Sequence, residues 1–150
     1  MTAIVLYSSK SGNTEKVAEA ISSEINADLV KVSNPNFDEN LDLLDYDLIF
    51  IGSGIRAGNP FSEMVSFLNT IELPVQKPFA IFLTWGGAGK TNQTCCSKLT
   101  KILQNKNQKI ITSSFCCYGK WNMRKSSHPN TKEICEAKNW AKNVVESIHI

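Results

Sequence analysis

Apolar residues along this chain alternate between short unbroken runs and runs at helical spacing. Unbroken runs occupy residues 3–7, 48–51 and 79–83, and such runs are typical of strands buried on both faces of a sheet. Between them, apolar residues recur every three or four positions, which predicts amphipathic helices. The helical sets are Val17, Ala18, Ile21 and Ile25; Phe61, Met64, Val65 and Leu68; Cys96, Leu99, Ile102 and Leu103; and Ile134, Ala137, Ala141, Val144, Val145 and Ile148.

Two further strands are predicted at residues 27–32 and 109–118, where apolar residues again cluster over a short length. Pro60 suits the first position of the second helix, because proline is tolerated where the helix needs no N–H donor. Asn130, followed three residues later by Glu133, predicts a capping box at the start of the last helix.

Five strands that alternate with four or five helices predict a parallel sheet with helices on both faces. Because crossover connections are right-handed, the pattern favours a doubly wound α/β fold, with a five-stranded parallel sheet in the order 2-1-3-4-5. The length suits one domain over residues 1–150. Ligands of such sheets bind beyond the carboxyl ends of the strands, so we expect the chemistry in the loops after strands one, three, four and five.

Charge and composition argue against several classes of function. The chain has 16 Lys and Arg residues against 14 Asp and Glu, a net charge of +2, which makes no strong electrostatic case for binding nucleic acid. No window reaches the roughly 18 apolar residues that a membrane span needs. The first apolar run is also too short for a signal peptide, so we expect a cytoplasmic protein with no membrane span.

The cysteines do not suggest a metal site. They are Cys95, Cys96, Cys116, Cys117 and Cys135. They are odd in number and contain no C-x-x-C pattern, and the two histidines, His128 and His149, are not spaced to complete a zinc site. We interpret the cysteines as buried small apolar residues in a reducing cytosol.

The loop after the first strand has the composition of a phosphate site. It contains Ser9, Lys10, Ser11, Gly12, Asn13 and Thr14. Three hydroxyls surround one glycine just before a predicted helix, and a helix N-terminus offers unpaired N–H groups and a partial positive charge. The G-x-G-x-x-G pattern is missing and no acidic residue ends the second strand, so the loop indicates a mononucleotide rather than a dinucleotide.

These residues resemble the phosphate loop of the flavodoxin family, which reads hydroxyl-x-hydroxyl-Gly-x-Thr. Residues 46–53 resemble the third strand of that family, and 128–130 its entry into the last helix. The resemblance covers the whole chain. It implies a flavodoxin-like fold and FMN as a cofactor bound without a covalent link.

By this resemblance, the loop after the third strand flanks the isoalloxazine ring. It contains Gly54, Ile55, Arg56, Ala57 and Gly58. Gly58 is the first candidate, and Gly54 the second, for the peptide that flips to bond the N5–H of reduced flavin, since glycine tolerates both backbone states. Beside the ring, Arg56 would stabilise the anionic reduced flavin and so raise its reduction potential by about 100 mV. Pointing into solvent, it would change the potential little.

The loop after the fourth strand is by resemblance the second one against the flavin. It contains Thr84, Trp85, Gly86, Gly87 and Gly89. With Lys90 and Thr91 it nearly forms a Walker A loop, but Thr84 stands where that pattern needs its first glycine. Trp85 either stacks on the flavin or packs at the base of the loop, and Tyr118 or Trp121 would cover the outer edge of the site.

Two functions follow from this resemblance. The first is an FMN-binding electron carrier with transient redox partners, such as ferredoxin-like proteins or flavin reductases. The alternative is an FMN-dependent oxidoreductase that acts on quinone or NAD(P)H, or one like protoporphyrinogen oxidase, because residues 53–56 resemble that branch of the superfamily. No residue in these loops looks like a dedicated catalytic acid, base or nucleophile, which favours the carrier.

Overall fold

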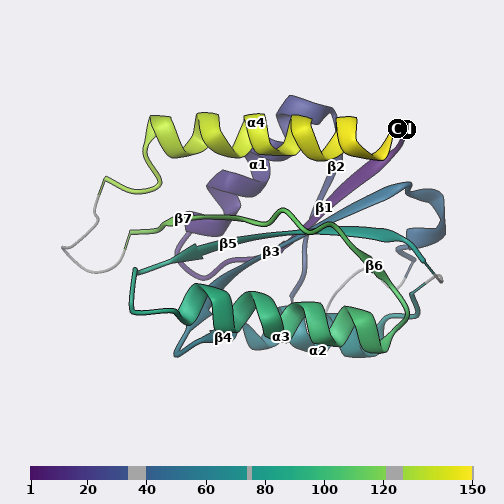
Figure 1. Ribbon diagram of the computed structural model, residues 1–150, viewed down its shortest axis with the longest axis horizontal. Helices are drawn as coiled ribbons and strands as arrows, with labels where there is room; N and C mark the ends of the chain where they lie inside the picture. Colours follow the sequence, from purple (N-terminus) through teal and green to yellow (C-terminus); the bar gives the residue numbers. More distant parts are fainter. Residues whose placement is uncertain (34–39, 74–75, 121–126, 150) are drawn as a thin grey trace.

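The computed structural model describes residues 1–33, 40–73, 76–120 and 127–149. Its strands are β1 (Ala3–Ser8), β2 (Asp28–Lys31), β3 (Leu48–Arg56), β4 (Asn59–Pro60), β5 (Pro78–Trp85), β6 (Lys109–Ile110) and β7 (Phe115–Tyr118). Its helices are α1 (Asn13–Ile25), α2 (Ser62–Thr70), α3 (Thr91–Asn105) and α4 (Thr131–Ile148), with one 3-10 turn, η1 (Leu43–Asp45). Figure 1 shows the sheet between two layers of helices.

The sheet has the predicted topology. Its order is β2-β1-β3-β5-β6, and all these neighbours run parallel. β7 also pairs with β5, further along that strand, so β6 and β7 share the fifth position. The α/β fold and the order 2-1-3-4-5 are therefore confirmed, with β4 added as a short antiparallel partner of β3.

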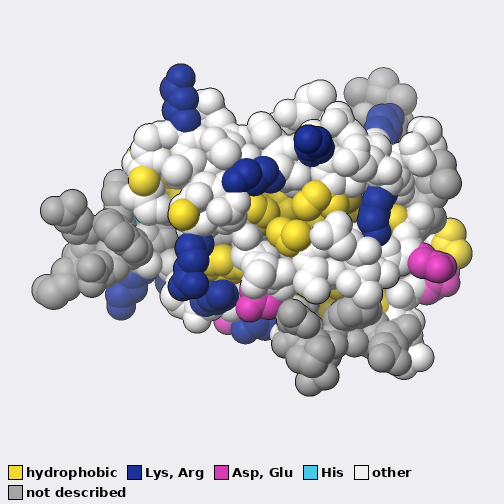
Figure 2. All heavy atoms as spheres, turned by 90° about the horizontal axis from the view of Figure 1, so that it is seen from below, with side chains coloured by type: hydrophobic (Ala, Val, Ile, Leu, Met, Phe, Trp, Pro, Cys, Tyr) yellow, Lys and Arg dark blue, Asp and Glu magenta, His cyan; other side chains and the backbone are white. Residues whose placement is uncertain are grey.

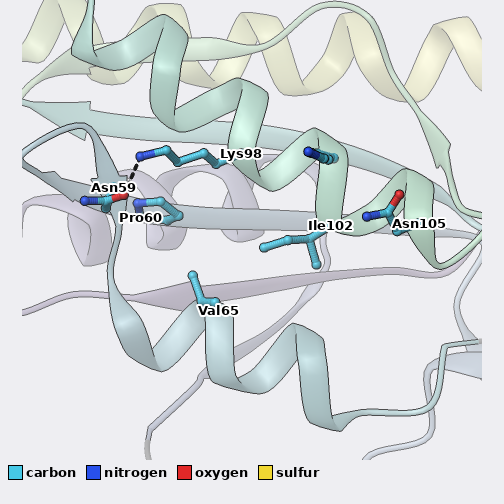
Figure 3. Close-up of a pocket in the computed structure, with 7 residues that line it drawn as sticks. Asn59, Pro60, Val65, Lys98, Ile102 and Asn105 are labelled. Carbon is cyan, nitrogen blue, oxygen red and sulfur yellow. Dashed lines mark hydrogen bonds between the residues drawn. The ribbon is translucent and has the colours of Figure 1, made fainter.

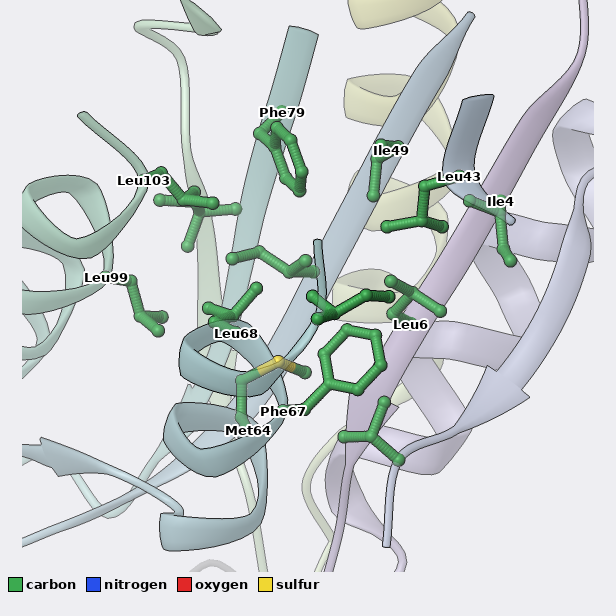
Figure 4. Close-up of a cluster of buried hydrophobic side chains, with 14 of the residues drawn as sticks. Ile4, Leu6, Leu43, Ile49, Met64, Phe67, Leu68, Phe79, Leu99 and Leu103 are labelled. Atoms are coloured by element: carbon green, nitrogen blue, oxygen red, sulfur yellow. The ribbon is translucent and has the colours of Figure 1, made fainter. Parts of the chain in front are cut away.

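The helices cover both faces of the sheet, with α1 and α4 on one face and α2 and α3 on the other (Figure 1). Successive residues of a strand point to opposite faces, so Ile49 and Ile51 join the core under α2 and α3, while Phe50 packs under α4. Figure 4 shows the first of these cores, where Leu68 and Leu99 meet the sheet. Burial on both faces explains the unbroken apolar runs in the sequence.

Gly52 lies in the middle of β3, directly beside a large ring on the neighbouring strand. It pairs with Phe82 of β5. A Cβ atom built on Gly52 would lie 2.0 Å from Cζ of Phe82. The ring, which is fully buried, therefore occupies the space that any larger residue at position 52 would need.

The third strand is longer than the sequence suggested. β3 continues to Arg56 and turns back through Ala57 and Gly58 into β4. The two turn residues have φ of 50° and 76°, which is the combination of a type I′ hairpin turn. Pro60 consequently ends β4 as a strand residue, and our placement of it at the start of a helix was wrong, because α2 begins at Ser62.

The fifth strand is interrupted rather than continuous over residues 109–118. Between β6 and β7, the N–H of Ile111 donates to the carbonyl of Phe79, 2.8 Å away. The indole of Trp140 on α4 donates to the carbonyl and the hydroxyl of Ser113, at 3.2 and 3.1 Å. The side chain of Trp140 thus occupies the carbonyl of Ser113, an acceptor that a continuous strand would use for pairing.

The cysteines are only partly as expected. Cys95 and Cys117 are buried, Cys96 and Cys116 are half-buried, and Cys135 is exposed. The expectation of burial was wrong for Cys135 because its neighbours Ile134 and Ala137 face the core and turn position 135 outward. Among the described residues, no helix is long and apolar enough to cross a bilayer.

Candidate functional site

A pocket of about 450 Å³ opens at the carboxyl ends of β1, β3 and β5. Parallel pairing brings these ends together, since Ser8 lies opposite Ser53 and Gly54 opposite Thr84. The lining consists of Ser9, Lys10, Ser11, Asn13, Thr14, Gly54, Ile55, Arg56, Ala57, Phe61, Thr84, Trp85, Gly86, Ala88, Thr91, Gly119 and Lys120. The three loops predicted from the sequence therefore meet at one site.

Most of the predicted site residues line this pocket, but four glycines do not. These are Gly12, Gly58, Gly87 and Gly89. Five lining residues were not predicted: Phe61, Ala88, Thr91, Gly119 and Lys120. Ala88 and Thr91 belong to the loop already singled out, whereas Phe61 and Gly119 reach the site through long-range packing that local spacing does not reveal.

The loop between β1 and α1 leaves the helix N-terminus open toward the pocket. Gly12 is the N-cap, with φ of 87° and no side chain to accept from the first turn. Its own N–H donates to Oγ of Ser9, 3.1 Å away, which curls the loop. The first N–H groups of a helix have no partner within it, so the start of α1 can receive an anion.

A buried hydroxyl pair joins this loop to β5. The Oγ1 atoms of Thr14 and Thr84 lie 2.8 Å apart, and both residues are buried. Because each hydroxyl can donate one bond and accept others, the pair retains hydrogen-bonding capacity toward the pocket. This bond thereby holds the start of α1 at a fixed distance from the end of β5.

The loop after β7 closes one side of the pocket against the first loop. Nδ2 of Asn13 donates to the carbonyl of Lys120, 3.0 Å away, and to Oγ of Ser11 at 3.1 Å. A Cβ atom on Gly119 would lie 2.6 Å from Nδ2 of Asn13, so glycine is needed for this approach. Trp121, a predicted cover for the site, lies outside the described residues.

Phe61 accounts for two residues whose roles the sequence left open. A Cβ atom on Gly54 would lie 2.4 Å from Cζ of Phe61, so the glycine makes room for that ring at the end of β3. Nζ of Lys10 lies 5.1 Å from the ring centroid of Phe61 and 3.8 Å from Oε1 of Glu63. Lys10 therefore connects the first loop to the start of α2, and Gly54 is a strand residue rather than a loop residue.

Trp85 lines the pocket and packs against the last residue of β7. Its ring stacks on Tyr118 with centroids 6.0 Å apart and planes 4° from parallel. Tyr118 in turn meets His128 edge to face, at 5.5 Å. Tyr118 therefore covers one face of the Trp85 ring and supports the wall of the pocket at that position.

Glu133 anchors this aromatic group to the start of α4. Its Oε2 accepts from the backbone N–H of Tyr118 at 2.9 Å, and its Oε1 accepts from the N–H of Asn130 at 3.0 Å and contacts Nδ1 of His128. Asn130 Oδ1 accepts from the N–H of Glu133, which completes the predicted capping box. Burial alone would raise the pKa of Glu133, but these hydrogen bonds outweigh it and hold the pKa below the usual 4.5.

Replacing Glu133 by Gln is expected to lower the free energy of unfolding by about 2 kcal/mol at pH 7, because a buried carboxylate loses several donors. A depressed pKa contributes stability that is present above the unfolded value of 4.5 and is lost as pH falls through the folded value. The difference between the two proteins should therefore shrink below pH 4.5 in urea unfolding measured at several pH values.

The control for this substitution is Glu136→Gln on the same helix, whose pair with Lys132 is exposed. It should change stability by less than about 0.5 kcal/mol. A difference between wild type and Glu133→Gln that stays constant down to pH 3 would contradict the role of the ionised carboxylate.

The described part of the pocket lining is cationic. Its ionisable side chains are those of Lys10, Arg56 and Lys120. Arg56 ends β3 and lines the pocket although its side chain is exposed. Together with the open start of α1, these charges favour an anionic ligand at this site.

Comparisons with known proteins agree with this geometry. Residues 4–126 match the family model described as flavodoxin domain. An uncharacterized protein of Methanocaldococcus jannaschii is 34% identical over 158 residues, which covers 98% of this chain and 100% of that protein. A flavodoxin from the domain Archaea is 23% identical, with a TM-score of 0.77 over 100% of both chains. A flavoprotein of Lactobacillus acidophilus in complex with FMN is 26% identical, with a TM-score of 0.62 over 77% of this chain and 91% of that one.

Proposed function

The chain belongs to the flavodoxin domain family, and from this premise we propose that it binds FMN without a covalent bond and carries electrons between redox partners. The observation that carries the proposal is the pocket where the loops after β1, β3 and β5 meet at the open N-terminus of α1. Its volume of about 450 Å³ lies within the range of cofactor pockets.

The donors around the start of α1 suit a phosphate group. Ser9, Ser11 and Thr14 supply hydroxyls, and Lys10 supplies a positive charge at the rim. Gly12 has open space around the position of a Cβ atom, so nothing crowds the approach to the first-turn N–H groups. These residues would hold the FMN phosphate by charge-assisted hydrogen bonds.

The other side of the pocket suits a flat aromatic ring. Trp85 and Ile55 offer apolar surface, and Gly86 offers a backbone without a side chain in the way. A bound flavin would supply the redox chemistry, while the protein orients it and sets its potential. Gly58, in the positive-φ turn beside the pocket, remains the candidate for the peptide that reorients when the flavin is reduced.

FMN titration of the apoprotein tests the proposal. We expect one equivalent of FMN to bind with quenching of its fluorescence, and riboflavin, which lacks the phosphate, to bind far more weakly. Equal affinity for the two flavins would contradict the phosphate site. Absence of binding to either would overturn the proposed function as a whole.

The alternative, an FMN-dependent oxidoreductase acting on quinone, NAD(P)H or protoporphyrinogen, makes a different kinetic prediction. A carrier is reduced by redox proteins in separate one-electron steps and reacts slowly with NAD(P)H. Stopped-flow mixing with NADPH and a soluble quinone distinguishes the two, because fast two-electron reduction with repeated quinone turnover would exclude a carrier.

Replacing Arg56 by Gln is expected to lower the potential for forming the anionic reduced flavin by on the order of 50 mV, because a positive charge near the ring stabilises the anion and solvent screens this exposed side chain. The measurement is redox titration of the FMN-loaded protein. Lys16→Gln, on an exposed position of α1 outside the pocket, is the matched control. An unchanged potential in Arg56→Gln would mean that Arg56 points away from the flavin.

A further inference from the structure

A second cavity lies on the other side of the β3–β4 turn, between α2 and α3. It has a volume of about 350 Å³. Figure 3 shows Val65 on α2 and Ile102 on α3 pointing into it, with Asn59 and Lys98 at one end and Asn105 at the other. Pro60 and Lys101 complete its lining. We refer to these seven residues as the α2–α3 groove.

The groove is apolar along its floor and positively charged along its rim. Val65 and Ile102 are half-buried, whereas Lys98 and Lys101 are exposed. On this face of the molecule, Figure 2 shows apolar side chains in an elongated strip with Lys and Arg side chains around it. An apolar floor with Lys98 and Lys101 on its rim favours a ligand that is apolar on one side and acidic at its edges.

The positive charge of the α3 side of the groove extends beyond the two lysines of the rim. From Leu73 to Lys132 the sequence contains ten Lys and Arg residues and no Asp or Glu, and α3 lies entirely within that stretch. Eleven of the fourteen acidic residues come before it, in residues 1–72. The acidic residue nearest the start of α2, Glu63, lies 3.8 Å from Nζ of Lys10 and is partly neutralised.

The groove shares a wall with the pocket proposed for FMN. Arg56 and Ala57 line that pocket, and Asn59, three residues after Arg56, lines the groove. Oδ1 of Asn59 accepts from Nζ of Lys98 at 2.5 Å, which ties the turn to α3. A protein seated in the groove would therefore lie beside the cofactor pocket, separated from it by a single hairpin turn.

We propose that the α2–α3 groove docks an acidic amphipathic helix of a partner redox protein. A third helix laid between two helices buries its apolar side chains on Val65 and Ile102, the helix-in-groove mode of recognition. Carboxylates at the edges of that helix pair with Lys98 and Lys101, and the cationic α3 half of the molecule attracts the acidic partner over longer distances. That the partner is a redox protein rests on the proposed function; the acidic helix rests on the groove itself.

Two synthetic helical peptides test the groove directly. Both carry leucines at positions i, i+3, i+4 and i+7, flanked by glutamates in one peptide and by lysines in the other. The FMN-loaded protein, labelled with ¹⁵N, is titrated with each peptide at low and at 0.5 M salt. We expect the acidic peptide to shift the amide signals of Val65, Lys98 and Ile102 and to bind at least about tenfold more weakly at high salt. The basic peptide should not bind.

The double variant Lys98→Glu/Lys101→Glu should weaken the acidic peptide at least tenfold and admit the basic one. The matched control is Lys16→Glu/Lys132→Glu, which makes the same change of charge at exposed positions of α1 and α4, on the opposite face of the sheet. The control should leave both affinities unchanged. Because all four side chains are exposed, circular dichroism should show that both variants remain folded.

Three results would overturn the proposal. They are equal binding of the two peptides, no shift at the groove residues at millimolar peptide, and a concentration-dependent dimer in sedimentation that Lys98→Glu/Lys101→Glu abolishes. The last would assign the groove to the acidic half of a second copy of this chain. The flavin absorbance of the same samples reports FMN binding separately, so a negative peptide result with intact flavin bands refutes the groove and leaves the proposed function standing.

Discussion

Substituting Ser11→Ala and Thr14→Val together is expected to weaken FMN binding by about 100-fold or more. Both residues line the pocket at the start of α1, and each hydroxyl would donate to a charged phosphate oxygen. A hydrogen bond to a charged group contributes roughly 1.5–3 kcal/mol, and two of them give at least about 3 kcal/mol. Titration of the apoprotein with FMN, followed by flavin fluorescence, measures the change.

Two controls separate the phosphate from the rest of the site. Riboflavin lacks the phosphate, so its affinity should be the same for wild type and the double variant. Thr84→Val breaks the buried bond to Thr14 while keeping the Thr14 hydroxyl, and it should lower stability more than FMN affinity. An equal loss of affinity for FMN and riboflavin would show that the double substitution distorts the ring site instead.

The second large effect is expected in the core, where Gly52→Ala should lower the free energy of unfolding by about 3 kcal/mol, the upper part of the range for overpacking. The added Cβ atom would lie 2.0–2.7 Å from three atoms of the Phe82 ring. That ring is fully buried in the core that α1 and α4 form with the sheet, so it cannot turn out into solvent. Urea unfolding of the purified variant measures the loss.

A double-mutant cycle shows whether the ring is the cause. Phe82→Ala alone should lower stability by about 3–5 kcal/mol, because it leaves a cavity. In Gly52→Ala/Phe82→Ala the new methyl group enters that cavity, so the combined loss should be clearly less than the sum of the two single losses. Additive losses would place the strain of Gly52→Ala elsewhere in β3.

The order of the sheet was predictable because burial on both faces leaves a strong mark in the sequence. Residues 48–51 and 79–83 are apolar at every position, and they lie in β3, the central strand, and in its neighbour β5. The loop at residues 9–14 was also predictable as a loop directly before a helix, and it lines the pocket at the start of α1, whereas its binding of an anion stays a prediction. The C-terminal capping box followed from Asn130 and Glu133 alone, because capping is local chemistry.

What could not be predicted depends on contacts between residues far apart in the sequence. Proline is equally acceptable at the end of a strand and at the start of a helix, so Pro60 alone does not indicate which element it joins. The positive-φ turn at Ala57 and Gly58 directs it into β4. Gly54 and Gly119 owe their identity to the distant side chains of Phe61 and Asn13, respectively. Spacing along the chain carries no information about such close approaches.

The separation of charge along the sequence also makes the distribution of charge over the folded protein uneven. Many acidic residues lie on α1, β2 and η1, toward the β2 edge of the sheet, where lysines of α4 pair with Glu24. The basic stretch builds β5, α3 and β6, toward the other edge. The molecule thus differs in local charge between its two sides although its net charge is only +2. It should therefore be retained at neutral pH by both cation- and anion-exchange resins, and its orientation at a charged electrode should invert with the sign of that electrode.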